Sequence, residues 1–113
     1  MNSRSRRRTI KLIESQIEDY KITIKKIDQL KKERIQTSMT LDKIDHLQRI
    51  VSAIELIYTR LPHDKKKLVE LKYWTHQHLT WDGLALSLNI DKRQAERWNN
   101  KIIEDIGERL GWL

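Results

Sequence analysis

The sequence predicts an all-α protein in which a long, coiled-coil-like N-terminal helical hairpin precedes a C-terminal three-helix module containing a helix-turn-helix. Three observations lead to this prediction. The composition has three glycines, one proline and no phenylalanine, which suits helices that each bury one apolar stripe. Apolar residues recur at alternating intervals of three and four through the first half of the chain. The second half carries apolar, small and capping residues at the intervals of two helices joined by a tight turn.

The length and charge of the chain limit the classes of protein to consider. A chain of 113 residues forms one domain or at most two small ones. Its formal net charge is +7, and residues 1–61 account for most of it, with 14 Lys and Arg against 8 Asp and Glu. A basic surface favours polyanionic partners such as DNA, RNA or acidic lipid. Because no apolar run reaches the length of a membrane span and no signal peptide is recognisable, we expect a cytoplasmic protein without membrane contact.

Residues 1–9 form a polar, basic segment that we expect to be disordered when the chain is free. Its cations are Arg4, Arg6, Arg7 and Arg8. Such an arm can pair with the phosphates of the DNA backbone or enter a minor groove. A solvated tail without a binding role explains the same residues equally well.

Residues 10–61 are predicted to form an antiparallel hairpin of two amphipathic helices. The first is predicted as one continuous helix of roughly 25 residues, and its apolar seam consists of Ile10, Ile13, Ile17, Tyr20, Ile24 and Ile27. The second is predicted to begin at a Thr40 cap, with Asp42 in its first turn, and to end at Pro62. Its seam consists of Ile44, Leu47, Val51, Ile54, Tyr58 and Leu61, and Ile50 and Ile57 widen it.

A single partner helix is not expected to bury either of these apolar stripes completely. We therefore expect the hairpin to pack on a second chain and to form a homodimer through residues 10–61. The alternative is that both stripes pack on the C-terminal helices of the same chain.

Residues 62–113 are predicted to form a separate module. Its first helix is predicted to run from a His63-Asp64 cap to Trp74, with Leu68 and Leu71 on its buried face. A loop containing His76 and His78 follows it.

The helix-turn-helix prediction rests on residues 80–98. Asn89 stands at the predicted turn, where Asn tolerates a positive φ. Thr80 and Asp91 can cap the first and second helix, and Gln94 can complete a capping box with Asp91. The residues expected to pack the two helices together are Leu84, Ala85, Leu88, Ile90, Ala95 and Trp98. An ordinary helical hairpin of a bundle is the alternative.

The exposed side of the second helix carries side chains of the kinds that hydrogen-bond base edges and phosphates in a major groove. These DNA-binding candidates are Lys92, Arg93, Gln94, Arg97, Asn100 and Lys101, together with Thr80 at the start of the first helix. Glu96 fits such a surface poorly, although a carboxylate can accept a hydrogen bond from cytosine. The helix is predicted to end at Gly111, after which Trp112 and Leu113 fold back as a hydrophobic clasp.

A more specific resemblance rests on five short stretches, Tyr73-Trp74, Leu79–Ala85, Asn89-Ile90, Arg97-Trp98 and Lys101–Gly111. In these stretches the chain resembles the RinA/ArpU family of phage-encoded transcriptional regulators, whose helix-turn-helix is similar to region 4 of bacterial sigma factors. The resemblance implies binding to late-gene or other phage promoters in the cytoplasm of a bacterial host. It also implies a DNA-facing position for Lys92, Arg93, Gln94 and Arg97.

Other kinds of site receive little support. The absence of cysteine excludes disulfides, thiolate zinc sites and cysteine nucleophiles. His76 and His78 on a loop are a weak metal-binding pattern, even with His63 or Asp64 added. No glycine-rich phosphate loop and no nucleophile–His–acid spacing is present, so we expect no enzymatic activity, no metal and no cofactor. Trp81 and Trp98 fall at helix-packing positions, which favours a core role over stacking on bases.

These observations leave three functional hypotheses. The first is a sequence-specific DNA-binding regulator whose hairpin dimerises or contacts RNA polymerase. The second is the small subunit of a terminase, which recognises phage DNA for packaging and also combines a helix-turn-helix with a helical oligomerisation hairpin. The third is a helical interaction protein, such as an adaptor or anti-repressor, whose basic charge is incidental.

Overall fold

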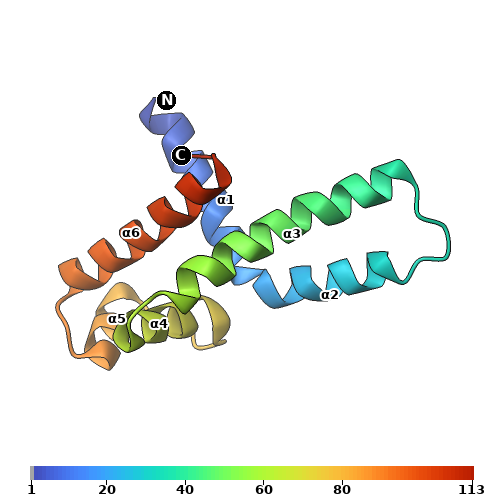
Figure 1. Cartoon of the computed structure of the whole chain (residues 1–113). Coiled ribbons are helices and arrows are strands. Elements are labelled where there is room, and N and C mark those ends of the chain that lie inside the picture. Colours follow the sequence, from blue (N-terminus) through green and yellow to red (C-terminus); the bar gives the residue numbers. More distant parts are fainter. Residues whose placement is uncertain (1) are drawn as a thin grey trace.

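The computed structural model describes residues 2–113 and shows an all-helical chain with no strand in that range. The predicted all-α class is therefore confirmed. The helices are α1 (Ser3–Glu18), α2 (Tyr20–Lys31), α3 (Ser38–Thr59), α4 (His63–Val69), the π-helical turn η1 (Glu70–Trp74), α5 (Trp81–Leu88) and α6 (Lys92–Leu110). The molecule is elongated, with extents of 51 × 32 × 23 Å, because α2 and the N-terminal part of α3 project from the other helices as an antiparallel arm (Figure 1).

The N-terminal segment differs from the disordered tail predicted for residues 1–9, of which Met1 lies outside the described residues. Helix α1 begins at Ser3, and the side chain of Asn2 caps it by accepting a hydrogen bond of 2.8 Å from the backbone N–H of Ser5. An N-cap satisfies a backbone donor that a helix cannot pair internally, so it stabilises the first turn. The basic residues of this segment are therefore carried on a helix.

The predicted continuous first helix is divided into α1 and α2 at Asp19. The backbone of Asp19 has φ −86° and ψ 7°, which departs from α-helical values and changes the direction of the chain. Helix α1 packs against α6 and η1, whereas α2 packs against α3. The sequence did not indicate this division, because the apolar spacing continues unchanged across the bend. The apolar residues before the bend nevertheless pack on different helices from those after it.

The antiparallel pair is therefore formed by α2 and α3 and not by the whole of residues 10–61. Its own small core consists of Ile27, Ile44 and Val51, with Tyr20, Ile24, Leu30 and Leu47 packed around it. Helix α3 begins earlier than predicted: Thr37 is the N-cap and accepts from the backbone N–H of Thr40, so Asp42 lies beyond the first turn.

The larger core joins segments that the sequence assigned to two separate domains. Ile13 and Ile17 of α1 are fully buried and belong to the same cluster as Leu68, Leu84 and Ile103. Ile50, Ala53 and Ile54 of α3 belong to it as well. A boundary between residues 61 and 62 consequently does not separate two cores. The stripes of the N-terminal half pack largely on the C-terminal helices of the same chain.

The helix predicted from residue 63 to residue 74 changes its geometry midway. It is α-helical from His63 to Val69 and continues as the π-helical turn η1 to Trp74. Pro62, and not the His63-Asp64 pair, occupies the N-cap position, while Asp64 lies in the first turn. A π-helical turn shifts the side chains that follow it around the helix axis. Here it brings Tyr73 and Trp74 against α1 and the start of α2.

Candidate nucleic-acid interface

Helices α5 and α6 are joined by a tight left-handed turn. Asn89 adopts φ 56° and ψ 44°, the left-handed conformation that Asn tolerates better than most residues. The backbone N–H of Ile90 donates to the carbonyl of Ala85 at 3.1 Å and closes the turn. The predicted positive φ at Asn89 is therefore confirmed.

Both helices begin at the predicted caps. The Thr80 hydroxyl accepts from the N–H of Gly83 at 3.0 Å, and the Asp91 carboxylate accepts from the N–H of Gln94 at 2.8 Å. Gly111 ends α6 with φ 75°, and the N–H groups of Trp112 and Leu113 both donate to the carbonyl of Gly107. The C-terminal fold-back was predicted correctly.

The buried side of α6 holds the helix in place. Helix α6 packs against α1, α3, α4 and α5. Its buried residues are Ala95, Asn99, Ile102, Ile103, Ile106 and Gly107. Asn99 is the polar member of this set, and its side chain is hydrogen-bonded to the hydroxyl of Tyr73 on η1 at 2.5 Å. The orientation of α6 is thus set by apolar packing against these four helices and by one buried polar contact.

The opposite side of α6 is exposed and is cationic over its first half. Its exposed residues there are Lys92, Arg93, Arg97, Asn100 and Lys101, which we call the α6 face. Among residues 2–113, Lys92, Arg93 and Arg97 form no ion pair, so their charges are available to an anionic partner. The structure thus brings five of the seven predicted DNA-binding residues onto one helix surface.

The remaining predicted residues lie at its margin. Gln94 is half-buried, and the Thr80 hydroxyl serves as the cap of α5. Lys101 lies 3.0 Å from Asp105, one turn further along α6, and this hydrogen bond and charge raise the pKa of Lys101 above its usual value. A cation held by a neighbouring acid is less available to an anionic ligand than Arg93 or Arg97.

A further cation, Lys65, lies beside this surface and is not among the residues predicted from the sequence. The Nζ of Lys65 on α4 lies 5.5 Å from the ring centroid of Trp98 on α6, within the range of a cation–π interaction. The Lys65-Lys66-Lys67 run at the start of α4 is the one sign of this cation in the sequence. The sequence does not show that Lys65 lies near α6, because that proximity depends on how α4 and α6 pack.

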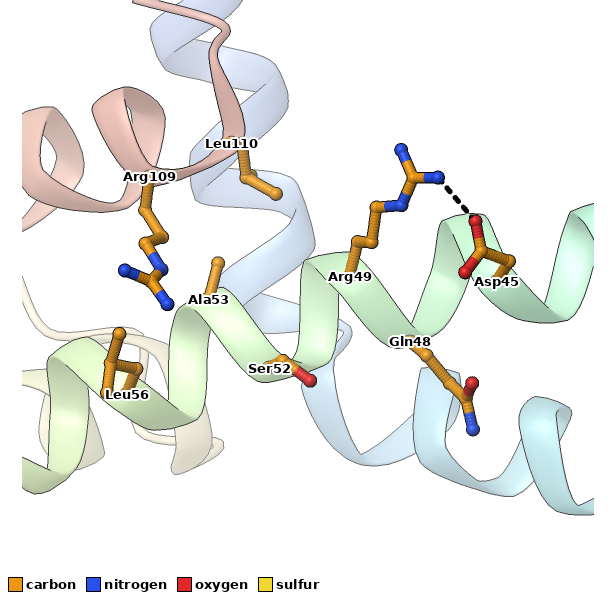
Figure 2. A pocket seen from close by; sticks show the side chains of 8 residues that line it. All are labelled: Asp45, Gln48, Arg49, Ser52, Ala53, Leu56, Arg109 and Leu110. Atoms are coloured by element: carbon orange, nitrogen blue, oxygen red, sulfur yellow. Dashed lines mark hydrogen bonds and ion pairs between the residues drawn. The ribbon is translucent and has the colours of Figure 1, made fainter.

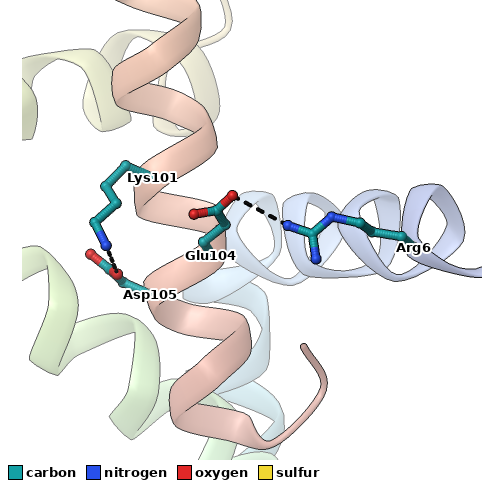
Figure 3. Close-up of polar contacts among 4 residues, drawn as sticks. All are labelled: Arg6, Lys101, Glu104 and Asp105. Carbon is teal, nitrogen blue, oxygen red and sulfur yellow. Dashed lines mark hydrogen bonds and ion pairs between the residues drawn. The ribbon is translucent and has the colours of Figure 1, made fainter. Parts of the chain in front are cut away.

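The second half of α6 is acidic, and α1 partly neutralises it. Figure 3 shows Arg6 reaching from α1 to Glu104, with Nη2 and Oε1 3.2 Å apart, and the Lys101–Asp105 pair beside it on α6. The Arg6 and Glu104 side chains are 45% and 43% exposed, so the pair contributes about 0–1 kcal/mol to stability. Arg6 therefore pairs within the chain, unlike the free arginine predicted for a DNA-binding arm.

The tryptophans of this region lie against the core. Trp81 and Trp98 are half-buried and pack on the larger core, as the helix-packing interpretation predicted. The Nζ of Lys72 lies 4.6 Å from the ring centroid of Trp81. Trp74 donates from its indole N–H to the carbonyl of Ile17 at 2.9 Å and stacks on Tyr20, which ties η1 to the bend between α1 and α2.

A groove lies between α3 and the C-terminal end of α6 (Figure 2). Its lining residues are Asp45, Gln48, Arg49, Ser52, Ala53, Leu56, Arg109 and Leu110. Asp45 and Arg49 pair with each other across one helical turn, at 2.5 Å. None of the predicted DNA-binding residues lines this groove. Its one acid is already paired, so it offers no acid–base pair for catalysis.

Two other kinds of feature are absent from the described part of the chain. No group of three or more His, Cys, Asp or Glu residues lies close enough to hold a metal ion. No helix within residues 2–113 has the length and apolar character needed to cross a membrane.

The chain was compared with family models, curated proteins and solved structures. The model of the family described as "Protein of unknown function (DUF722)" matches residues 1–108. No curated protein and no solved structure matched the chain.

Proposed function

The chain belongs to the family described as "Protein of unknown function (DUF722)", and we propose that this member is a sequence-specific DNA-binding transcriptional regulator. The observation that carries the proposal is the α5–Asn89–α6 arrangement. A capped short helix, a left-handed turn and a long capped helix present an exposed cationic face. This is the geometry with which a helix-turn-helix places its second helix in a major groove.

The chemistry of the α6 face supports the same proposal. Arg forms bidentate hydrogen bonds to guanine and Asn to adenine, while Lys contacts guanine or phosphate. The face combines these residue types on an element held rigidly by four neighbouring helices. The resemblance to the RinA/ArpU family implies the biological setting, a phage regulator in a bacterial host that acts on late-gene or other phage promoters. RNA polymerase is proposed only as the alternative to self-association for the helical hairpin.

The α2–α3 arm supplies a surface for self-association. It projects from the body and carries exposed apolar side chains, with Ile22 66%, Ile35 79%, Met39 82% and Leu41 53% exposed. We propose that these residues form a homodimer interface within residues 10–61. A two-fold dimer of helix-turn-helix proteins reads half-sites about 34–36 Å apart, or a multiple of that distance.

Binding to DNA fragments tiled across the genome that encodes the chain tests the proposal. The native chain, Arg93→Ala/Arg97→Ala and the matched control Lys25→Ala/Lys26→Ala, which removes two exposed charges from α2, are compared at two salt concentrations. A specific Arg–guanine contact contributes about 1–3 kcal/mol, so the α6 variant is expected to lose at least ~30-fold in affinity for a footprinted site. The control is expected to retain the footprint.

Two outcomes contradict the proposal. One is the absence of any protected sequence at low salt. The other is an equal loss of affinity in the α6 variant and in the α2 control, because net charge alone would then explain binding.

The projecting arm also favours one alternative, the small subunit of a terminase that recognises DNA for packaging. Its exposed apolar residues suit repeated contacts in a closed ring as well as a two-fold dimer. The mass of the native chain in solution separates these functions. A ring of about eight or more subunits favours packaging, and a monomer or dimer favours regulation.

A further inference from the structure

Helix α1 carries a second cationic surface that is separate from the α6 face. Its members are Arg4, Arg7, Arg8 and Lys11, which we call the outer basic face. All four side chains are exposed and line one shallow groove on the surface of α1. Among residues 2–113, none of them forms an ion pair.

The helical geometry of α1 separates this surface from the core and from Arg6. Successive residues of an α-helix are rotated by about 100°, so positions 4, 7, 8 and 11 fall on one side. Ile13 and Ile17, which are fully buried, fall on the other side together with Arg6, which reaches α6. The outer basic face therefore points away from the helix that Arg6 contacts.

The density of charge on this face suits a phosphate backbone. Its four cations occupy about 10 Å of helix axis, which is close to the Debye length at 0.1 M salt. They therefore act together on one anionic partner. Duplex DNA carries one negative charge per about 1.7 Å of axis, so several phosphates fall within the same length. The capped N-terminus of α1 adds the positive end of the helix dipole.

A membrane surface fits these residues less well. A helix that binds in a lipid interface inserts an apolar face into the acyl region. The apolar side of α1 is buried against α6 and η1, with Ile13 and Ile17 at 0% exposure. Leu12 is 48% exposed, but one apolar side chain does not form a face that could insert into lipid.

We propose that the outer basic face of α1 is a second DNA-backbone contact surface, on a different side of the molecule from the α6 face. It contributes affinity without reading sequence, and it contacts a duplex segment other than the one in which α6 lies. The identification of DNA as the polyanionic partner rests on the proposed function, whereas the inference that this face binds phosphates rests on the structure of α1 alone. Arg6 belongs to the attachment of α1 and not to this surface.

The test measures how the affinity for a duplex without the footprinted site depends on salt. The variant Arg4→Ala/Arg7→Ala/Arg8→Ala/Lys11→Ala is compared with the native chain. The matched control is Lys25→Ala/Lys26→Ala/Lys31→Ala/Lys32→Ala, which removes the same charge from exposed positions at α2. Each phosphate contact contributes about 0.9 to the slope of log affinity against log salt, so the α1 variant is expected to lose about 3 to 4 units of slope. The control is expected to lose less than about one unit.

A conservative variant guards against a folding defect. Arg4→Lys/Arg7→Lys/Arg8→Lys keeps every charge, and it is expected to retain the native slope because a phosphate contact needs a charge and not a bidentate fork. Circular dichroism of all variants checks that α1 remains helical.

The results of the two tests separate the two proposals. If the α1 variant loses slope while the native chain protects no DNA sequence at low salt, the second surface stands and the proposed function fails. Equal slopes for the α1 variant and its α2 control overturn the second surface, whatever the α6 variant does. Binding to phosphatidylserine-containing vesicles that exceeds binding to DNA, and depends on the same four residues, also overturns it in favour of a membrane.

Discussion

The hydroxyl of Tyr73 lies 2.5 Å from Oδ1 of Asn99, and this contact joins η1 to the buried side of α6. Asn99 is 3% exposed, and the Tyr73 hydroxyl also lies 3.1 Å from Oε2 of Glu14 on α1. Lys72 approaches the same carboxylate at 3.8 Å. Helix α1, the turn η1 and helix α6 therefore share one polar network, and the position of the α6 face depends on it.

Removing the Tyr73 hydroxyl is expected to destabilise the chain. Tyr73→Phe leaves the Asn99 amide buried without its partner, which costs about 1–3 kcal/mol of unfolding free energy. Urea denaturation followed by circular dichroism measures it. Tyr73→Phe/Asn99→Leu should be less destabilised than Tyr73→Phe, because no buried polar group is left unpaired. Asn100→Ala, at an exposed position on the same helix, serves as control and should lie within about 0.5 kcal/mol of native.

The left-handed turn at Asn89 predicts opposite effects for two small replacements. Asn89→Ala places a Cβ without Asn's local hydrogen-bonding capacity at φ 56°, with an expected cost of about 1 kcal/mol. Asn89→Gly is expected to be neutral or slightly stabilising, because glycine adopts this conformation without strain. Thermal unfolding of both variants makes the comparison. A larger loss for the glycine variant would show that the Asn side chain, and not its backbone conformation, holds the turn.

The two helical glycines are expected to respond differently to alanine. A Cβ at Gly107 would lie 2.6 Å from Cδ1 of Leu113 and 2.9 Å from Cδ1 of Ile13, so Gly107→Ala overpacks the clasp at a cost of about 1–3 kcal/mol. At Gly83 the nearest atom is 3.4 Å away, and Gly83→Ala is expected to stabilise α5 by up to about 1 kcal/mol. Denaturant titration of Gly107→Ala, Gly83→Ala and the native chain measures the difference in their unfolding free energies.

Leu113→Ala provides the internal check on the clasp. It removes the two nearest contacts of the new methyl group, and should therefore recover part of the Gly107→Ala loss. Strictly additive effects of the two changes would contradict a clash between them.

Charges on the arm are expected to reduce self-association. Ile22→Lys/Met39→Lys/Leu41→Lys places three cations on the exposed apolar positions of the α2–α3 arm, where like charges from two chains would meet. Sedimentation of the native chain and the variant gives the two association constants. Leu86→Lys is the control, because Leu86 is 83% exposed but lies on α5, outside the arm. Equal association of native and arm variant would rule out this interface.

The three tyrosines are expected to ionise only at strongly alkaline pH. Burial, together with a hydrogen bond to Glu55, raises the pKa of Tyr20 to about 12. Burial and Glu70 raise the pKa of Tyr58, and burial and Glu14 raise that of Tyr73. The folded chain thus holds these protons more tightly than the unfolded chain, whose tyrosines titrate near pH 10.0. For Tyr20, this contribution to stability is fully present below pH 10.0 and is lost as pH rises through about 12.

Phenolate absorbance of the native and the denatured chain measures this difference. Glu55→Gln keeps a hydrogen-bond acceptor but removes the charge, so it should lower the pKa of Tyr20 towards the denatured value. A native titration near pH 10.0 for all three tyrosines would contradict the burial that the structure assigns to them.

The sequence predicted the helical elements of the second half well and their organisation in the first half poorly. The caps at Thr80 and Asp91, the positive φ at Asn89 and the end of α6 at Gly111 were predicted correctly. The bend at Asp19 was missed, because the apolar spacing continues through it unchanged. Residues 1–9 were predicted as disordered from their charge, yet Asn2 caps a helix there whose later turns are buried.

The candidate binding surfaces were also predicted only in part from the sequence. Arg93, Arg97 and Asn100 were predicted to share the exposed side of one helix, and helical periodicity was enough to place them there. The pairing of Arg6 with Glu104 joins residues 98 positions apart, and no local pattern signals it. The same holds for Lys65 beside Trp98.

The sequence by itself determined the all-α class, the caps and the left-handed turn, because each depends on side chains within one or two helical turns of the backbone groups they satisfy. The tertiary structure alone decided that α1 leaves the arm and packs on α6, and that one larger core spans both halves of the chain. That choice depends on which apolar surfaces fit together among segments far apart in the chain. An apolar stripe such as Ile10, Ile13 and Ile17 indicates that these side chains will be buried, but it does not indicate against which helix.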